Sequence, residues 1–319
     1  MFKFLNKNLF FQAFLLIALL GYSGWSIFSG LQVVMLPDMS TLSSAILSLM
    51  ETNPLLMKII VSLTLLFQLI LFQYLFRKHN LTEGTVLWAP IFYLSLLIGN
   101  NTFSQLTPIF FINFIVLLLL LLNSEYDARS IKNRVFFSGI LIGITFFMDF
   151  ATAILLSFIT LSLVINRFSK AKDILLSLFG FSIPLIYFCS YFFFTDQLDV
   201  LENFITPSSF FGFMNSIDQL VSQDIIYIGF SFLPLIYFII TLSFVFSQKL
   251  IVLRRRLTVI NVLTATLFVL SFISCEHYPQ LLAWLFVPIS IYFALITQIK
   301  KNWILHDVII LISIVLLCL

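Results

Sequence analysis

The stretch FFMDFATA, residues 146–153, contains the single charged side chain, Asp149, of an apolar run that extends over residues 135–165. Apolar runs of this kind are characteristic of chains that cross a lipid bilayer, where one helical span takes about 20 residues. The run is too long for one ordinary span and too short for two. Asp149 therefore lies either within one long span or at the apex of a short helical hairpin.

The composition of the whole chain agrees with a membrane location. Of its 319 residues, 61% are hydrophobic and only 10% are charged, and the mean hydropathy is +1.11. A soluble domain could not keep that much apolar surface away from water. Because no connection between apolar segments is long enough for a soluble domain, residues 1–319 are predicted to form one polytopic, all-α membrane domain.

Apolar windows predict the positions of the membrane spans. The first span, which follows Lys3 and Lys7, is expected to be an uncleaved helix rather than a signal peptide. With the ambiguous run counted once, the predicted spans are residues 9–29, 55–75, 85–98, 107–122, 135–165, 174–194, 225–246, 257–274, 281–298 and 303–319. A hairpin in the ambiguous run raises their number to about eleven.

The distribution of Lys and Arg decides between one span and a hairpin, because these residues favour the cytoplasmic side of a membrane. With a cytoplasmic N-terminus, a hairpin at 135–165 places all of the 17 basic residues except Lys58 inside. A single span would leave fewer than half of them inside. The hairpin is therefore predicted, with Asp149 facing outside, and Gly139 and Gly143 form a GxxxG pattern that would allow close helix packing.

The outer side is predicted to hold two longer segments, residues 30–54 and 195–224, each with an interfacial helix. Most of the acidic residues also fall on this side: Asp38, Glu51, Asp149, Asp196, Asp199, Glu202, Asp218, Asp224 and Glu276. Two explanations stay open. Outer loops lack Lys and Arg and so look acidic, or these acids line a cavity for a cation, a metal or a sugar.

Asp149 itself has two interpretations. As a helix N-cap, its side-chain oxygen would accept a hydrogen bond from a backbone N–H near Ala151 or Thr152. As a functional group, it would be a carboxylate held at membrane depth, where charges are costly and often serve function. The sequence does not decide between the two.

Two outer turns contain further candidate site residues. In SCEHYPQ, residues 274–280, a predicted tight turn ends at Pro279 and presents Glu276, His277 and Tyr278. A Glu–His pair can transfer a proton or bind a metal, but one pair supplies too few ligands for a closed metal site. Asn100 and Asn101 form the other turn, which is suited to hydroxyl recognition but even more to a plain connecting loop.

The histidines argue against a multi-histidine metal centre. They are His79, expected in a basic inner loop, His277, and His306 in the last span. Haem-copper and non-haem iron chemistry need several such ligands together. The chain also lacks a phosphate-binding loop and a nucleic-acid patch. No cofactor is predicted, and a divalent cation at the outer acids stays open.

Three segments resemble an uncharacterised family of Bacteroidota polytopic inner-membrane proteins of about this length. They are GILIGITFFMDFATAILLSFITLSLVINRF (139–168), LLSLFGFSIPLIYFCSYFF (175–193) and HYPQLLAWLFVPISIYFALI (277–296). The resemblance implies a location in the bacterial inner membrane and no established activity. The architecture is also similar to polyprenyl-phosphate-sugar glycosyltransferases of the GT-C type, which place a catalytic acid in the first outer loop. Asp38 or Glu51 would match it, without the usual paired acids.

Three functions are compared on this basis, and the sequence does not decide whether the chain is an enzyme. The first is an envelope glycan enzyme that uses a polyprenyl-linked saccharide, with Asp38 as general base or metal-positioning acid and Asp149 and Glu276 lining the cavity. The second is a non-catalytic scaffold that binds membrane lipid and envelope membrane proteins. The third is a transporter, which ranks last because no internal repeat is found.

Overall fold

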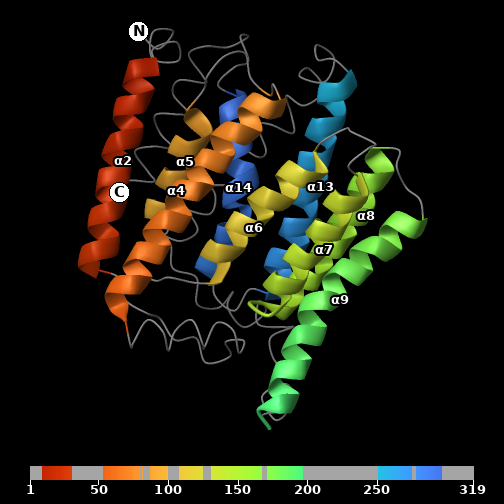
Figure 1. Cartoon of the computed structure of the whole chain (residues 1–319). Coiled ribbons are helices and arrows are strands. Elements are labelled where there is room, and N and C mark those ends of the chain that lie inside the picture. Colours follow the sequence, from red (N-terminus) through yellow and green to blue (C-terminus); the bar gives the residue numbers. More distant parts are fainter. Residues whose placement is uncertain are drawn as a thin grey trace.

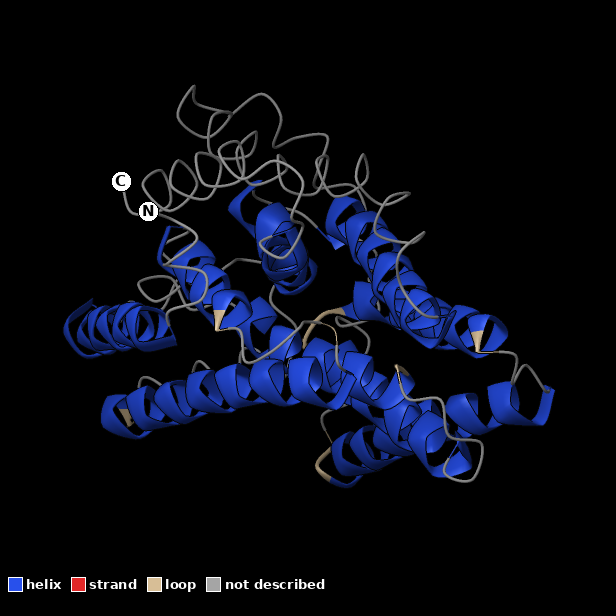
Figure 2. Cartoon of the chain, turned by 90° about the horizontal axis from the view of Figure 1, so that it is seen from above, coloured by secondary structure: helices blue, strands red, loops and turns tan. Residues whose placement is uncertain are grey.

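The computed structural model describes residues 9–30, 53–79, 81, 87–99, 108–124, 131–166, 171–196, 251–274 and 278–296. Figures 1 and 2 show that the described part consists of helices, so the predicted all-α class is confirmed there. Its elements are α2 (Leu9–Gly30), α4 (Pro54–His79), α5 (Trp88–Gly99), α6 (Pro108–Asn123), α7 (Ile131–Phe146), the 3-10 helix η1 (Phe150–Ile154), α8 (Leu155–Ile165), α9 (Ala171–Phe194), α13 (Ile251–Ser274) and α14 (Tyr278–Ile296). Outside the described residues lie the predicted spans 225–246 and 303–319 and nearly all of the segments with predicted interfacial helices.

From α2 to α9, successive α-helices run in opposite directions, and α13 starts at the same end as α9, so the helix ends gather at two ends of the bundle (Figure 1). At one end, His79 at the end of α4 lies 2.7 Å from the Ser124 hydroxyl after α6, and Arg256 near the start of α13 donates to the His79 carbonyl oxygen at 2.7 Å. At the other end, Lys58 near the start of α4 donates to the carbonyl oxygen of Phe28 near the end of α2, at 2.7 Å. We call the first of these the basic end and the second the opposite end.

The run 135–165 is interrupted at its centre, as predicted. Helix α7 ends at Phe146, and the chain turns before η1 and α8 lead back. The Asn123 side chain, at the end of α6, bonds both limbs, because it donates to Ser138 of α7 at 3.0 Å and accepts from Ser162 of α8 at 3.3 Å. Both limbs therefore meet at the basic end. The run is a hairpin, and its apex, which includes Asp149, lies toward the opposite end.

The apex of the hairpin satisfies its own backbone. The N–H groups of Met148 and Asp149 both donate to the Thr145 carbonyl oxygen, at 2.9 and 3.0 Å. Unpaired backbone groups cannot face lipid, so such local pairing is required if the apex lies at membrane depth. Helix α9 covers the apex, since Phe188 stacks on Phe147 with ring centroids 3.8 Å apart, and α9 extends past the apex in Figure 1.

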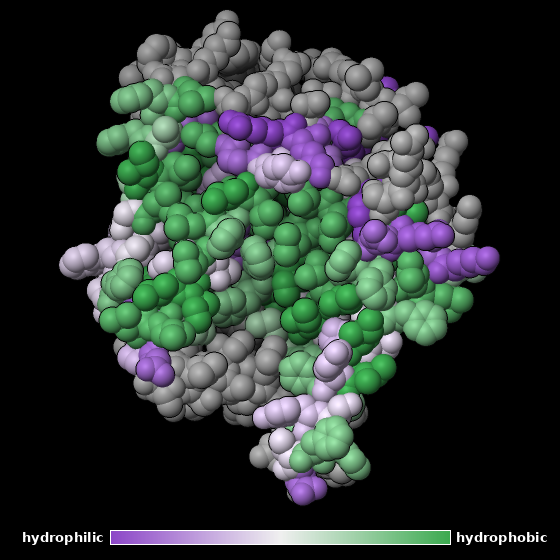
Figure 3. Space-filling view, viewed as in Figure 1, coloured by the Kyte–Doolittle hydropathy of each residue, from purple (hydrophilic) through white to green (hydrophobic). Residues whose placement is uncertain are grey.

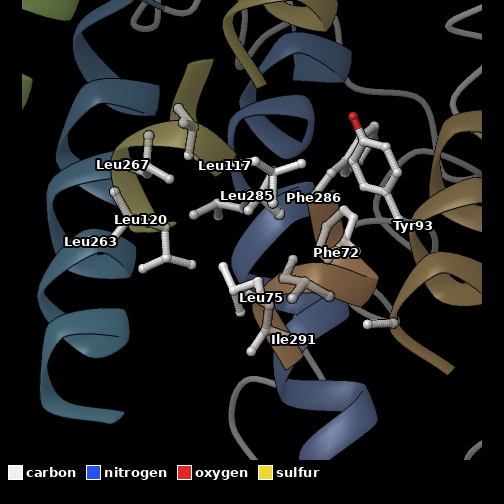
Figure 4. Close-up of a cluster of buried hydrophobic side chains, with 14 of the residues drawn as sticks. Phe72, Leu75, Tyr93, Leu117, Leu120, Leu263, Leu267, Leu285, Phe286 and Ile291 are labelled. Atoms are coloured by element: carbon white, nitrogen blue, oxygen red, sulfur yellow. The ribbon is translucent and has the colours of Figure 1, made fainter. Parts of the chain in front are cut away.

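Within the described residues, three helices are long and apolar enough to cross a membrane: Gln12–Ser29 within α2, Pro54–His79 and Ala171–Phe194. They expose large apolar side chains such as Trp25, Phe67 and Tyr187, and Figure 3 shows a broad apolar surface. Among the shorter helices, α5 is enclosed. In α5, all residues from Trp88 to Leu97 are buried, and Figure 4 shows its Tyr93 beside side chains of α4 and α14. At 12 residues, α5 covers about 18 Å, so length alone does not make it a full span.

Several helices begin earlier than the apolar windows predicted, and α13 and α7 differ most. Helix α13 begins at Ile251 instead of residue 257, and α7 begins at Ile131 instead of residue 135. Lys and Arg are good helix formers, so a helix can extend past the apolar segment into a charged turn. The correction places Arg254, Arg255 and Arg256 on a helix instead of in a loop.

Helices α7 and α9 approach each other closely at three glycines. A Cβ atom on Gly143 would lie 2.7 Å from the Phe181 carbonyl oxygen of α9. A Cβ atom on Gly139 would overlap a carbonyl oxygen of α9, and one on Gly180 would overlap the Phe136 carbonyl oxygen of α7. The predicted GxxxG pattern therefore does permit close packing, and Gly180 completes the contact from the facing helix.

Candidate functional site

Asp149 is the N-cap of η1. Its backbone is extended, with φ −153° and ψ 119°, and its carboxylate oxygen Oδ1 accepts a hydrogen bond from the Ala151 N–H at 2.9 Å. A cap of this kind satisfies one of the N–H groups that a helix start leaves unpaired. The capping role, one of the two interpretations open from the sequence, is therefore present. The other interpretation, a functional carboxylate at membrane depth, requires side chains from the outer segments to lie beside Asp149.

Most of the other predicted site residues lie outside the described residues: Asp38, Asn100, Asn101, Glu276 and His277. Tyr278 is described only as the first residue of α14. Within the ranges that the structure describes, no group of three or more His, Cys, Asp or Glu residues is placed to hold a metal ion. Convergence of the predicted outer acids on one cavity stays a prediction.

The turn SCEHYPQ is shorter than predicted. Helix α14 begins at Tyr278, so Pro279 lies in its first turn instead of ending the connection. Proline is well tolerated there, because the first N–H groups of a helix have no partner within the helix and the proline ring already holds a helical φ. The connection from α13 to α14 is reduced to residues 275–277.

Capping by Asp149 leads to a testable contrast between two substitutions. Asp149→Ala should lower the free energy of unfolding by about 1 kcal/mol, whereas Asp149→Asn should change it by only a few tenths, since asparagine is an equally good N-cap. Thermal unfolding of the purified chain in detergent measures both. Equal destabilisation by the two variants would show that the negative charge, not the cap, is what the fold requires.

The richest group of polar side chains in the described part lies at the basic end, and we call it the polar junction. Its centre is Asn123, which is 6% exposed. Besides the bonds to Ser138 and Ser162, its carbonyl oxygen accepts from the Asn166 side chain at 3.1 Å, and Arg134 donates to the neighbouring Leu122 carbonyl oxygen at 3.3 Å. The junction comprises His79, Asn123, Ser124, Arg134, Ser138, Ser162, Asn166 and Arg256. It ties α4, α6, α7, α8 and α13 together.

His79 and Ser124 form the one pair in the junction with the spacing of a base and a nucleophile. Their Nε2 and Oγ atoms are 2.7 Å apart, within the reach that nucleophilic catalysis needs. Yet the side chains are only 1% and 4% exposed, and Ser124 Oγ also lies 3.3 Å from the Leu121 carbonyl oxygen. A substrate has no access to such a pair, so we assign it a role in joining α4 to α6. The prediction of a loop position for His79 is wrong, because it is the buried last residue of α4.

A second polar group crosses the centre of the bundle. Tyr93 of α5 donates to Gln68 Oε1 of α4 at 2.9 Å, and Gln68 Nε2 donates to the Phe110 carbonyl oxygen of α6 at 2.9 Å. Asn113 of α6 donates to the Ala283 carbonyl oxygen of α14 at 3.0 Å. Buried polar side chains are costly unless they are bonded. These bonds therefore fix how the four central helices meet.

Sequence analysis singled out none of these buried polar residues except His79. The signal that would have found them is the position of a lone amide within an apolar window, as at Gln68, Asn113 and Asn123. Polar side chains inside a membrane segment usually face the bundle interior. Attention to charged residues alone passed over them.

The described side chains therefore show a helical framework with polar ties at its basic end and its centre, and a capping acid at the apex of its hairpin. Comparisons of the chain with models of known protein families, with curated proteins and with solved structures give no match.

Proposed function

We propose that the chain is a bacterial inner-membrane protein with about eleven passes, whose N-terminus and basic end lie in the cytoplasm. The observation that supports this orientation is the placement of the described Lys and Arg residues. Lys58 lies at the opposite end, and all others lie at the basic end: Arg77, Lys78, Lys132, Arg134, Lys172, Arg254, Arg255 and Arg256. Short basic segments at span ends are retained on the cytoplasmic side.

Cysteine labelling in intact cells tests this orientation. With the native cysteines replaced by serine, Lys58→Cys should react with a membrane-impermeant maleimide, and Lys172→Cys should react only after the cells are opened. Both positions are near helix ends and are not buried. Labelling of Lys172→Cys in intact cells would mean that residues 135–165 cross the membrane once, and it would overturn the hairpin topology.

For the activity, we propose an envelope glycan enzyme of GT-C-like type that acts at the opposite end on a polyprenyl-linked saccharide. The proposal is supported by the positions of the helices that precede or follow the candidate acids in the chain. Asp149 lies toward this end, and η1, which it caps, packs against α13, the helix that leads to Glu276. The end of α2 and the start of α4, which flank the segment containing Asp38, meet at the same end.

Substitution of the acids tests the enzymatic proposal. Asp38→Asn and Glu276→Gln should each abolish consumption of a polyprenyl-linked sugar by membranes that contain the protein, if these acids serve as base and cavity wall. Asp196→Asn is the control, because Asp196 is an exposed acid that follows α9 and has no role in the proposal. Full activity in both of the first two variants would remove the assignment.

A non-catalytic scaffold of an envelope assembly is the second candidate. It is favoured because described polar side chains have structural roles: Asp149 caps a helix, and Asn123 joins three helices. We expect such a protein to co-purify with another envelope membrane protein in mild detergent. A chain that purifies alone and converts a lipid-linked sugar would exclude this candidate.

A further inference from the structure

The structure brings together two basic runs that are far apart in the sequence. Arg77 and Lys78 are at the end of α4, and Arg254, Arg255 and Arg256 are in the first turns of α13. The link between them is the hydrogen bond of 2.7 Å from Arg256 Nη1 to the His79 carbonyl oxygen, which joins residues 177 positions apart. We call these five cationic residues the basic patch.

The two segments that contain the patch have a net positive charge. Residues 76–84 and 247–256 together contain six Lys and Arg residues and one acid, Glu83. Juxtamembrane groups of four to eight Lys and Arg residues are typical of sites that attract anionic lipid headgroups. Guanidinium and ammonium groups are also the side chains that best bind phosphate oxygens.

The face of α4 that leads to the patch is apolar and exposed. Exposed side chains recur every three or four residues along it, at Leu56, Ile60, Leu63, Phe67, Ile70 and Tyr74. This spacing defines one helix face. The next positions on the same face are Arg77 and Lys78, and Lys78 Nζ lies 5.1 Å from the Tyr74 ring centroid. Figure 3 shows hydrophilic side chains gathered directly beside the apolar surface at this end.

An amphiphile fits this arrangement better than a free anion does. A phosphate group at the patch would leave the exposed face of α4 unused, whereas acyl chains lying on that face would place an attached headgroup beside Arg77 and Lys78. We propose that the basic patch binds the phosphate headgroup of an anionic phospholipid whose acyl chains lie along α4. The site is independent of the activity proposed for the opposite end.

Native mass spectrometry of the full chain tests the proposal. In micelles that contain equal amounts of dioleoylphosphatidylglycerol and dioleoylphosphatidylcholine, the wild-type chain should retain the anionic lipid preferentially. The triple variant R77Q/K78Q/R254Q should lower that preference about tenfold. These three residues are exposed, and Arg256, which bonds His79, is left in place so that the fold is kept. The charge-preserving variant R77K/R254K should retain the preference.

Two controls separate the patch from general positive charge and from phosphate alone. K132Q/K172Q removes two exposed charges on α7 and α9 at the same end, and it should leave the lipid ratio unchanged. An equal fall in that variant would overturn the assignment to the patch. Excess sodium phosphate at constant ionic strength should not displace the lipid, and displacement would show that the site takes a free anion. An unchanged lipid ratio in the triple variant would overturn the proposal outright.

Discussion

Replacing Gly180 by alanine is expected to lower the free energy of unfolding by about 1–3 kcal/mol, because overpacking a close contact forces the backbone to move. The added methyl group would overlap the Phe136 carbonyl oxygen of α7 and approach the Ile140 backbone nitrogen at 3.2 Å. Both neighbours are backbone atoms, which cannot rotate away as a side chain can. The two helices would have to separate, and the Phe147–Phe188 stack over the hairpin apex would weaken with them.

Gly21→Ala is the matched control for this substitution. Gly21 is also a helical glycine, in α2, but a Cβ atom there would meet nothing within 4 Å. Alanine favours a helix over glycine by about 1 kcal/mol, so this variant should be neutral or slightly more stable. Thermal unfolding in detergent, followed by size-exclusion chromatography, measures both. If Gly180→Ala were as stable as Gly21→Ala, the close α7–α9 contact would not exist in the protein.

The hairpin could be predicted from the sequence because an odd or even number of passes decides on which side of the membrane the later basic segments lie. Each added pass reverses the side of every later basic segment, and Lys and Arg are numerous after residue 165. The single charged residue of the run, Asp149, and the distribution of Lys and Arg along the whole chain therefore indicated the same break. The structure has that break between Phe146 and Phe150, and the limbs on both sides meet at Asn123.

Contacts between distant segments could not be predicted in this way. Nothing local to Arg256 indicates that it would donate to a carbonyl oxygen of α4, and nothing at Gly139 indicates which helix would supply Gly180 as its partner. Such pairings depend on how helices are ordered around one another, and hydropathy does not encode that order. A single sequence also gives no covariation from which contacts could be inferred.

At the candidate site residues, charge and residue type gave one correct prediction and one wrong prediction. Charge and residue type selected Asp149, and its cap was among the expected roles because the second helix of the hairpin was expected to begin just after it. The same criteria assigned His79 to a loop, since it follows Arg77 and Lys78 and precedes a polar stretch. Basic residues near a span end do not mark the end of the helix, because their long side chains reach the membrane surface from within the last turn.

Replacing Asn123 by alanine is expected to lower the free energy of unfolding by about 1–2 kcal/mol. Its side chain makes bonds to Ser138, Ser162 and the Leu119 carbonyl oxygen, and interhelical hydrogen bonds in membrane proteins average about 0.6 kcal/mol each. The loss falls on the joint between α6 and both limbs of the hairpin. We therefore expect the hairpin to loosen first at the basic end, where the three helices share this residue.

Asn123→Leu separates the hydrogen bonds from the shape of the side chain, because leucine has the same branched arrangement of heavy atoms as asparagine but no polar atoms. Ser190→Ala is the control, since Ser190 is exposed and bonds only a carbonyl oxygen of its own helix, that of Ile186 at 2.7 Å. Similar destabilisation by the alanine and leucine variants, with none in the control, would assign the effect to hydrogen bonding. A leucine variant as stable as wild type would mean that packing alone holds these helices together, and the polar junction would then have to be explained by something other than stability.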